Sequence, residues 1–261
     1  MRILLCNDDG ILAPGLAALY AAVADLGEVT VVAPSGPRSA TGHGITLEQP
    51  LTVQRVQVGR PGSPDSFAGI SVDGSPADCV RLAILRLMDG RPDLVLAGLN
   101  AGANVGINVF YSGTVAAAAE GVMLGIPAVA FSACASGTPV DFPRAARLCR
   151  WVLDGLLKCE LTHRDLINVN IPELRPSLPQ GLRVCAQSTA GVIDRYHDHS
   201  HPNGQEAYKI GTEFAFTDPH ADSDVACLEA GFVTVTPLHV DMTRHERLPG
   251  LAACQWPDMP E

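Results

Sequence analysis

MRILLCNDDGIL, residues 1–12, is the stretch that decides the fold. A short apolar run, residues 3–6, ends abruptly at two adjacent acids, Asp8 and Asp9. Such a run is typical of a buried parallel strand that leads into a loop. In an open α/β sheet, ligands bind outside the carboxyl ends of such strands. Two neighbouring acids there repel each other and lose solvation, which favours a divalent cation beside them, although a turn that caps the next helix uses the same residue types.

The composition is that of a folded protein with a large core. Of the 261 residues, 47% are hydrophobic and 18% are charged, which argues against global disorder. The length predicts one main domain with an appendage. The formal net charge of −10 argues against binding of duplex nucleic acid or of an anionic membrane, but it permits an anionic substrate held through a metal.

The cysteines and the apolar runs bear on the cellular compartment. Eight cysteines are scattered without a C-x-x-C pair, and several lie in apolar runs, which predicts reduced core thiols. The first apolar run is too short for a signal peptide, and no run of about 18 apolar residues is present to span a membrane. We therefore expect a cytoplasmic protein without a membrane anchor.

The first half of the chain alternates predicted strands and helices. Leu16, Leu19 and Val23 recur at helical spacing after Pro14, and a second apolar run follows, so the unit is β-α-β and favours a parallel sheet. Buried strands are predicted at residues 29–33, 93–99 and 128–132, extended strands with one wet face at 45–58, a linker at 59–69, and an amphipathic helix at 143–158. We expect a three-layer, Rossmann-like, mostly parallel core over residues 1–135, with that last helix packed on it.

The second half has a different character. Strand-like runs occur at residues 166–171, 182–188, 207–216 and 232–236 with few helices between them. We expect residues 160–261 to be a β-rich C-terminal portion with a hairpin arm at about 188–225 and an oligomerisation tail. Alternating histidines in the arm, His197, His199 and His201, suit either a metal tract or a solvated hairpin.

Several polar residues are predicted to meet at the edge that carries Asp8. Ser39 lies in the polar loop after the second strand, and the third buried strand delivers Asn100 to the same edge. A long glycine- and asparagine-rich loop follows and ends in Ser112, Gly113 and Thr114, directly before an alanine-rich helix. These residues can face an anion at a helix N-terminus, or simply cap the helix.

This combination of residue types favours phosphoryl chemistry. Hard oxygen ligands suit magnesium, manganese or calcium rather than zinc, and a cation beside a hydroxyl-lined helix N-terminus describes a phosphoryl site. Covalent aspartyl phosphatases usually separate their two acids by one residue. A receiver domain opens with adjacent acids but is about half this length, and no G-x-S-x-G motif marks a serine hydrolase.

Nine motifs, taken in chain order, closely resemble the SurE family (survival protein E) over nearly the whole chain. They are N-D-D-G-I-x-A-P-G at residues 7–15, V-V-A-P at 31–34, I-T-L at 45–47, P-A-D-C-V at 76–80, P-D-L-V at 92–95, G-x-N-x-G-x-N-x-G at 98–106, Y-S-G-T-V at 111–115, N-V-N-I-P at 168–172 and T-P-L-H-V-D at 236–241. The chain departs from the pattern at residues 35–40, SGPRSA, where the family commonly has D-R-N-x-S-G. The serine of that motif is retained.

The resemblance implies an activity and a set of site residues. It implies one divalent cation, Mg²⁺ or Mn²⁺ and in vitro also Ca²⁺, held by Asp8, Asp9, Ser39 and Asn100, with phosphate near Asn104, Ser112, Gly113 and Thr114. The implied reaction is hydrolysis of nucleoside 5′-monophosphates, sometimes of 3′-monophosphates and short polyphosphates. Homodimers or homotetramers with exchanged C-terminal elements are also implied.

The sequence leaves the catalytic role of the acid pair open. Asp8 can position or deprotonate the attacking water, and a covalent aspartyl phosphate on Asp8 is the other variant. Two other classes of protein stay open: a metal-free binding or signalling module, and a hydrolase of a phosphodiester or an N-glycosidic bond. Neither alternative would release inorganic phosphate from a nucleoside monophosphate.

Overall fold

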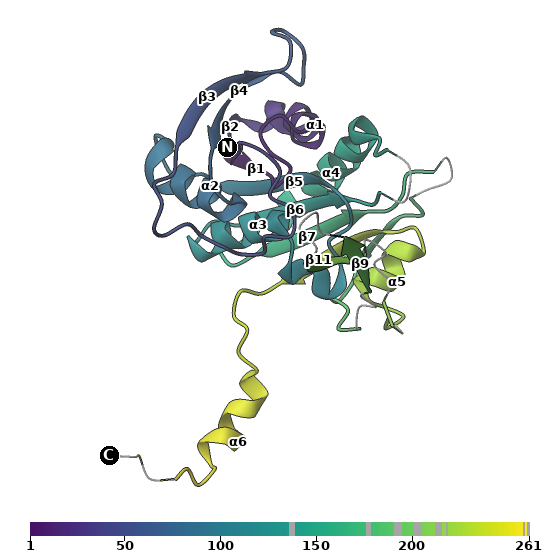
Figure 1. The fold of residues 1–261 in the computed structure, drawn as a ribbon. Coiled ribbons are helices and arrows are strands. Elements are labelled where there is room, and N and C mark those ends of the chain that lie inside the picture. The colour runs from purple at the N-terminus through teal and green to yellow at the C-terminus, as the bar shows by residue number, and fades with distance from the viewer. Residues whose placement is uncertain are drawn as a thin grey trace.

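The structure is a computed structural model that describes residues 1–135, 139–175, 179–190, 195–200, 205–211, 216–217, 219–257 and 259. A nine-stranded sheet runs through its centre in the order β3-β4-β2-β1-β5-β6-β7-β11-β8 (Figure 1). Its strands are β1 (Arg2–Cys6), β2 (Glu28–Pro34), β3 (Val53–Val58), β4 (Phe67–Val72), β5 (Leu94–Ala101), β6 (Ala128–Ala133), β7 (Leu166–Ile171), β8 (Leu182–Val184) and β11 (Val233–Leu238). In this sheet β3 pairs antiparallel with β4, and β11 with β7, while the other pairs are parallel.

Helices cover both faces of the sheet and make the three layers that the sequence predicts. The main helices are α1 (Pro14–Val23), α2 (Pro76–Leu82), α3 (Gly113–Met123) and α4 (Phe142–Leu157). One buried apolar cluster joins α1 and α4 to the sheet, and a second joins α2 and α3 to its other face. Strand β1 serves both clusters, because Ile3 and Leu5 point into the first while Leu4 and Cys6 point into the second.

The strand order reverses at the centre of the sheet. From β1 the chain first builds outward through β2 to β4 and β3, and it then returns to place β5 on the other side of β1. In doubly wound folds this reversal opens a crevice at the carboxyl ends of the strands, where ligands bind. Residues 7–10, which follow β1, and residues 100–102, at the end of the neighbouring β5, therefore lie at the binding edge.

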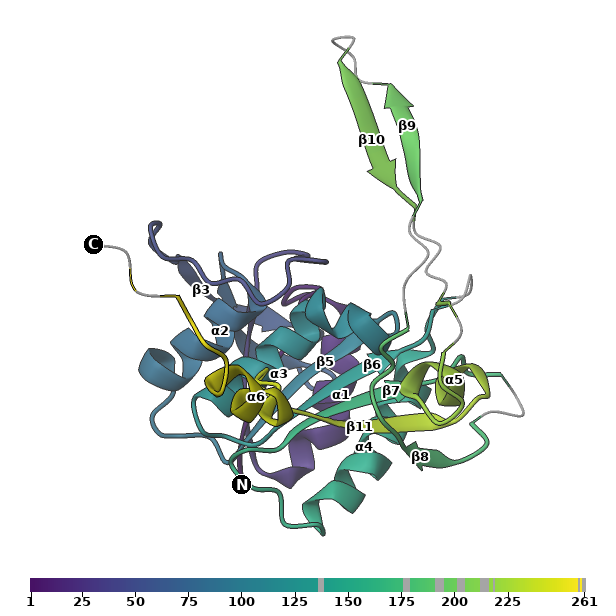
Figure 2. The same cartoon turned by 90° about the horizontal axis from the view of Figure 1, so that it is seen from below.

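The C-terminal half completes the same sheet and adds two projections. Strands β7, β11 and β8 extend the central sheet, with the short helix α5 (Asp224–Glu229) beside β11. Strands β9 (Tyr196–Ser200) and β10 (Glu206–Ile210) form a separate antiparallel hairpin that stands away from the body in Figure 2. The chain ends in an extended tail with the short helix α6 (Leu248–Ala252), far from the sheet in Figure 1. Among the described residues, no helix is both long and apolar enough to cross a membrane.

The structure corrects some predicted boundaries. Within the predicted strands at 45–58, only Val53–Val58 is a strand, and the predicted linker at 59–69 runs into β4, which begins at Phe67. The sequence hides β4 because Gly69 interrupts its apolar run. Space at Gly69 is tight, since a Cβ would lie 3.1 Å from the side chain of Ile11. Of the predicted strands 182–188 and 207–216, the first is only three residues long and the second is Glu206–Ile210, with residues 212–215 outside the described part.

Candidate active site

The turn that carries the acid pair is closed by Asn7. The buried Asn7 amide donates from Nδ2 to the carbonyl of Gly10 (3.0 Å), and its Oδ1 accepts from the Gly10 N–H (3.2 Å). Gly10 has φ +101°, and a Cβ there would lie 3.1 Å from the backbone of Gly36. The turn is therefore fixed by an asparagine that bonds its own backbone and by a glycine that lets the next loop approach.

Asp8 and Asp9 stand just after the carboxyl end of β1. Asp8 is 5% exposed and accepts a hydrogen bond from the Thr114 hydroxyl. Burial raises the pKa of Asp8 above its ordinary value, the Thr114 bond opposes that rise, and the neighbouring charge of Asp9 adds to it. Burial also raises the pKa of Asp9, against a hydrogen bond from the backbone of Ala101. Among the described residues, neither acid takes part in an ion pair.

The N-terminus of α3 abuts this acid pair. A Cβ on Gly113 would lie 2.7 Å from the Asp8 Cβ and 3.0 Å from its Oδ2, so only glycine allows the helix to start this close to the carboxylate. Ser112 is the N-cap, and its hydroxyl accepts from the Val115 N–H (3.1 Å). Ser112 therefore caps α3, which is one of the two roles that the sequence left open, and the helix that it caps starts at Gly113 beside Asp8.

The loop that bears Ser39 is pinned next to Asp8. The Arg38 N–H donates to the carbonyl of Asp8 (2.7 Å), which puts Ser39 one residue from that contact, with its side chain exposed. Further along, the Gly42 N–H donates to the carbonyl of Tyr111 (3.2 Å). The loop therefore bridges the end of β1 and the start of α3.

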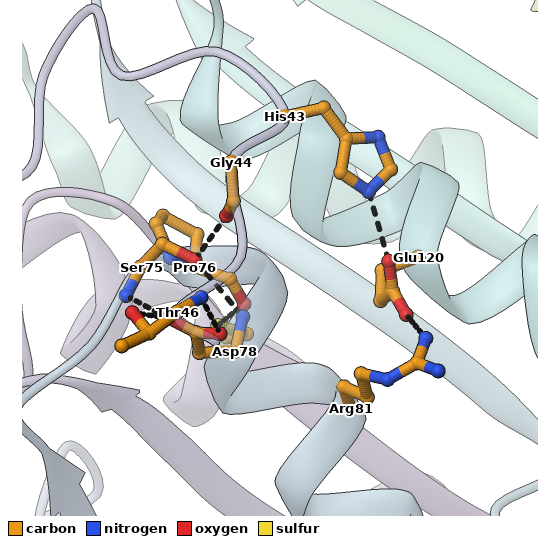
Figure 3. Close-up of polar contacts among 9 residues, drawn as sticks. His43, Gly44, Thr46, Ser75, Pro76, Asp78, Arg81 and Glu120 are labelled. Carbon is orange, nitrogen blue, oxygen red and sulfur yellow. Dashed lines mark hydrogen bonds and ion pairs between the residues drawn. The ribbon is translucent and has the colours of Figure 1, made fainter. Parts of the chain in front are cut away.

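Two polar clusters anchor the far end of this loop (Figure 3). The buried Glu120 of α3 accepts from Arg81 Nη1 (2.6 Å) and pairs with His43 Nε2 (2.8 Å). The Asp78 carboxylate accepts from the N–H (2.8 Å) and hydroxyl (2.7 Å) of Thr46. Burial opposes ionisation of Glu120, but the hydrogen bonds from His43 and Arg81 outweigh it and lower the pKa of that carboxyl.

Asn100 and Asn104 come from β5 and the loop after it. Asn100 is half-buried, and its Nδ2 donates to the carbonyl of Gly102 (2.8 Å), which leaves its Oδ1 as an available ligand atom. Asn104 is buried and donates from Nδ2 to the Ser132 hydroxyl (2.8 Å), while its backbone bonds Asn168 and Asn170 of β7. The structure places Asn104 in a polar network beneath the loop.

The donor set fits a hard divalent cation. Two carboxylates that burial destabilises, a serine hydroxyl and an amide oxygen are the oxygen donors that Mg²⁺ and Mn²⁺ accept, and a cation would supply the missing countercharge. Nowhere in the described part of the chain are three His, Cys, Asp or Glu side chains grouped as a metal site, and the candidate site itself combines two acids with a serine and an asparagine. His197 and His199 lie exposed on β9, and His201 lies outside the described residues.

A cleft of about 490 Å³ opens beside the start of α3. It is lined by polar side chains that include Ser112, His43 and Gln187, together with apolar side chains such as Phe110 and Met123. A cleft with an apolar wall and a few polar groups suits a small organic ligand. Of the candidate phosphate-binding residues, the cleft lining includes Ser112.

Sequence reasoning missed the residues that hold the loops. Glu120, Arg81 and His43 lie far apart in sequence. So do Asp224 and Gly106, whose N–H donates to the Asp224 carboxylate. One signal was available: Glu120 is the sole acid in the alanine-rich helix α3. An acid in an otherwise apolar helix needs buried partners, and that requirement would have flagged it.

The fold and the grouping of these side chains are those of a doubly wound α/β protein with a polar site at its switch point. The chain belongs to the SurE family, because residues 3–193 match the family described as Survival protein SurE.

Known proteins are similar over nearly the full length. The chain is 43% identical over 256 residues to the 5′-nucleotidase SurE of Symbiobacterium thermophilum, and 43% identical over 256 residues to that of Methylococcus capsulatus, with 97% of each chain covered in both cases. The crystal structure of the SurE protein from Aquifex aeolicus matches with a TM-score of 0.79 and 36% identity. That match covers 96% of this chain and 98% of the other.

Proposed function

We propose that this protein is a metal-dependent phosphomonoesterase that hydrolyses nucleoside 5′-monophosphates to nucleoside and inorganic phosphate. The observation that carries the proposal is the pair Asp8 and Asp9, which lacks a cationic partner among the described residues and stands against the N-terminus of α3. The relatives named 5′-nucleotidase SurE support this reaction class. Activity toward 3′-monophosphates and short polyphosphates belongs to the same proposal.

The proposed ligands of one divalent cation are Asp8, Asp9, Ser39 and Asn100. Mg²⁺ and Mn²⁺ are the candidates, and Ca²⁺ is a possible substitute in vitro. When bound, the cation supplies charge neutralisation to the phosphoryl group and activates water for attack. All four proposed ligands are oxygen donors: Asp8 and Asp9 come just after β1, Ser39 lies in the loop after β2, and Asn100 lies at the end of β5.

The proposed phosphate-binding residues are Asn104, Ser112, Gly113 and Thr114. Backbone N–H groups at the start of α3 stabilise the negative charge that develops on the phosphoryl oxygens. The Ser112 hydroxyl accepts from Val115 and keeps its own O–H to donate, and Asn104 keeps a second amide hydrogen. Asp8 orients or deprotonates the attacking water while Thr114 holds its carboxylate, and attack by Asp8 itself is the second variant.

A phosphate-release screen tests the proposal. Wild-type protein is assayed with 5′-AMP, 3′-AMP and tripolyphosphate in Mg²⁺, in Mn²⁺ and in chelator. We expect release from 5′-AMP that chelator abolishes. Asp9→Asn should remain folded and lose this release, whereas the exposed control Asp89→Asn should keep it. A folded Asp9→Asn variant with undiminished turnover would sink the assignment, and release in chelator would exclude the metal.

We further propose a cytoplasmic homo-oligomer, dimeric or tetrameric, with exchanged C-terminal elements. All eight cysteines are free thiols in the structure, which suits a reducing compartment. Support for the exchange comes from the tail, whose Met242 and Trp256 side chains are 79% and 69% exposed. No duplex nucleic acid or membrane partner is proposed, in keeping with the net charge of −10.

A further inference from the structure

Two residues of the C-terminal half form hydrogen bonds with Gly106, in the loop between Asn100 and Ser112. The Gly106 N–H donates to Asp224 Oδ2 (2.9 Å), and its carbonyl accepts from Gln187 Nε2 (2.9 Å). Gly106 has φ +59°, and a Cβ there would lie 2.7 Å from the ring of Phe216. Both backbone polar groups of one loop residue are thus fixed by side chains 81 and 118 residues away.

Asp224 is fully buried and is held by backbone N–H groups. Besides Gly106, it accepts at Oδ1 from Ser188 (2.8 Å) and from Val225 (2.8 Å). Within the described part of the chain, Asp224 forms no ion pair. A buried carboxylate is tolerated only when its hydrogen bonds replace its solvation. Each of these three N–H groups is therefore bound tightly to one rigid point.

Apolar packing strengthens the same junction. Val105 of the loop forms a buried cluster with Val225 and Leu228 of α5, and Ala103 and Phe216 pack against it. The loop therefore meets α5 through an apolar contact next to the hydrogen bonds. Packing of this kind resists sliding of the loop along the helix.

The junction also gathers the two ends of the arm that carries β9 and β10. Ser188 precedes the hairpin and Asp224 follows it, and Ala186 pairs with Ser223 in an isolated parallel bridge. The Asp224 N–H donates to the carbonyl of Ala186 (2.8 Å). In Figure 2 the hairpin stands out on the same side of the body as α5. One carboxylate therefore ties together the chain entering the arm, the chain leaving it and the loop of the candidate active site.

We propose that Asp224 is a positioning residue that couples the root of the arm to the active-site loop and so fixes Asn100 and Ser112 for phosphoryl transfer. The inference rests on the proposed function for its kinetic part. It goes beyond that function by giving the C-terminal half a role in placing the site. Displacement of a loop by about 1 Å costs up to about 100-fold in rate, so a coupling of this kind is measurable.

The test uses the full-length protein and matched amide substitutions. Asp224→Asn keeps the shape but turns an amide NH₂ toward N–H donors, whereas the control Asp222→Asn makes the same change at an exposed residue two positions earlier. Gln187→Ala removes the other side-chain hydrogen bond to Gly106 and leaves the buried carboxylate in place. Phosphate release from 5′-AMP gives kcat, KM and the Mn²⁺ dependence, and hydrogen–deuterium exchange reports on residues 100–112.

We expect Asp224→Asn to lower kcat about tenfold or more with a smaller effect on KM, and to speed exchange in residues 100–112 but not in β1 or α1. Gln187→Ala should do the same more weakly, and Asp222→Asn should match wild type. Wild-type kcat and wild-type exchange in a folded Asp224→Asn variant would overturn the proposal. So would faster exchange throughout the sheet with unchanged kcat per folded molecule, because that describes a purely structural role. If wild type releases no phosphate, the proposed function fails, and the exchange pattern still decides the coupling.

Discussion

Gly113 leaves no room for a side chain between α3 and the acid pair. A Cβ there would meet the Asp8 side chain at 2.7 Å, so Gly113→Ala must push the carboxylate or the helix start aside. We expect a folded protein that has lost most of its phosphate release and whose melting temperature no longer rises with Mn²⁺.

A second helical glycine provides the control for Gly113. Gly155 in α4 has nothing within 4 Å of an added Cβ, so Gly155→Ala should keep activity and gain up to about 1 kcal/mol of stability. Wild-type kcat and Mn²⁺ response in Gly113→Ala would show that the close approach does not matter.

Glu120 makes the stability of the protein depend on pH in a defined direction. Burial disfavours its charge, but His43 and Arg81 more than offset this, so its pKa in the folded state lies below the ordinary value of 4.5. A lowered folded pKa stabilises the fold above about pH 4.5, and this contribution disappears as the pH falls through the folded value. Glu120→Gln should therefore lower the free energy of unfolding by about 2 kcal/mol at pH 7 and by less at pH 4.

Urea denaturation at the two pH values measures the Glu120 effect. Glu229→Gln, an exposed glutamate on α5, is the control and should change stability by less than about 0.5 kcal/mol at either pH. An equal loss at pH 4 and pH 7 for Glu120→Gln would contradict the ionic account.

The N-terminus of α2 serves as a helix cap and as a loop anchor. The Ser75 hydroxyl accepts from the Asp78 N–H (3.0 Å) and donates to the carbonyl of Gly44 (2.6 Å). Ser75→Ala should cost about 1 kcal/mol of stability and also raise the Mn²⁺ concentration needed for activity, because the loop that carries Ser39 is released. Asp141→Ala removes only the cap of α4 and should cost similar stability without changing the Mn²⁺ response. Equal Mn²⁺ responses in the two variants would contradict the claim that Ser75 anchors the loop that carries Ser39.

At the level of elements, the sequence predicts what is local. Mainly apolar runs identify β1, β2, β5 and β6, because strands buried on both faces carry few polar residues, and α4 follows from its amphipathic spacing. The start of α2 is also predictable from local sequence, because Ser75, Pro76 and Asp78 are the residue types of a helix N-terminus. Strand β4 is not predicted from the sequence, because Gly69 interrupts its apolar residues and because the strand is defined by its pairing with β2 and β3.

The candidate site likewise has a part that the sequence predicts and a part that it does not. Asp8, Asp9 and Asn100 are predictable at one edge because the two acids come just after β1 and Asn100 lies at the end of β5, and parallel strands end together. The supports of the site are not readable, since His43–Glu120 and Gly106–Asp224 join residues 77 and 118 positions apart. No local pattern specifies which buried acid meets which loop.

For the molecule as a whole, the exposed tail after residue 240 is the feature that favours association with another copy of the chain. Met242, Leu248 and Trp256 are all at least half exposed, and apolar side chains gathered on one exposed segment favour contact with a partner surface. We expect light scattering to give a dimer or tetramer for the full chain, and a smaller species for a chain that stops at Val240. Melting of the full chain should depend on protein concentration. A monomeric full chain would contradict the exchange.

The central place of β1 has a consequence for how the chain folds. The strand precedes both of its partners in the chain, because β2 begins at residue 28 and β5 begins at residue 94. Pairings of such long range form slowly, and an unpaired apolar strand is prone to aggregate until they do. The middle of the sheet can close only when β5 has been synthesised, and the same closure brings the ends of β1 and β5, which carry candidate site residues, to one edge. Folding of the core and assembly of the site are therefore one event.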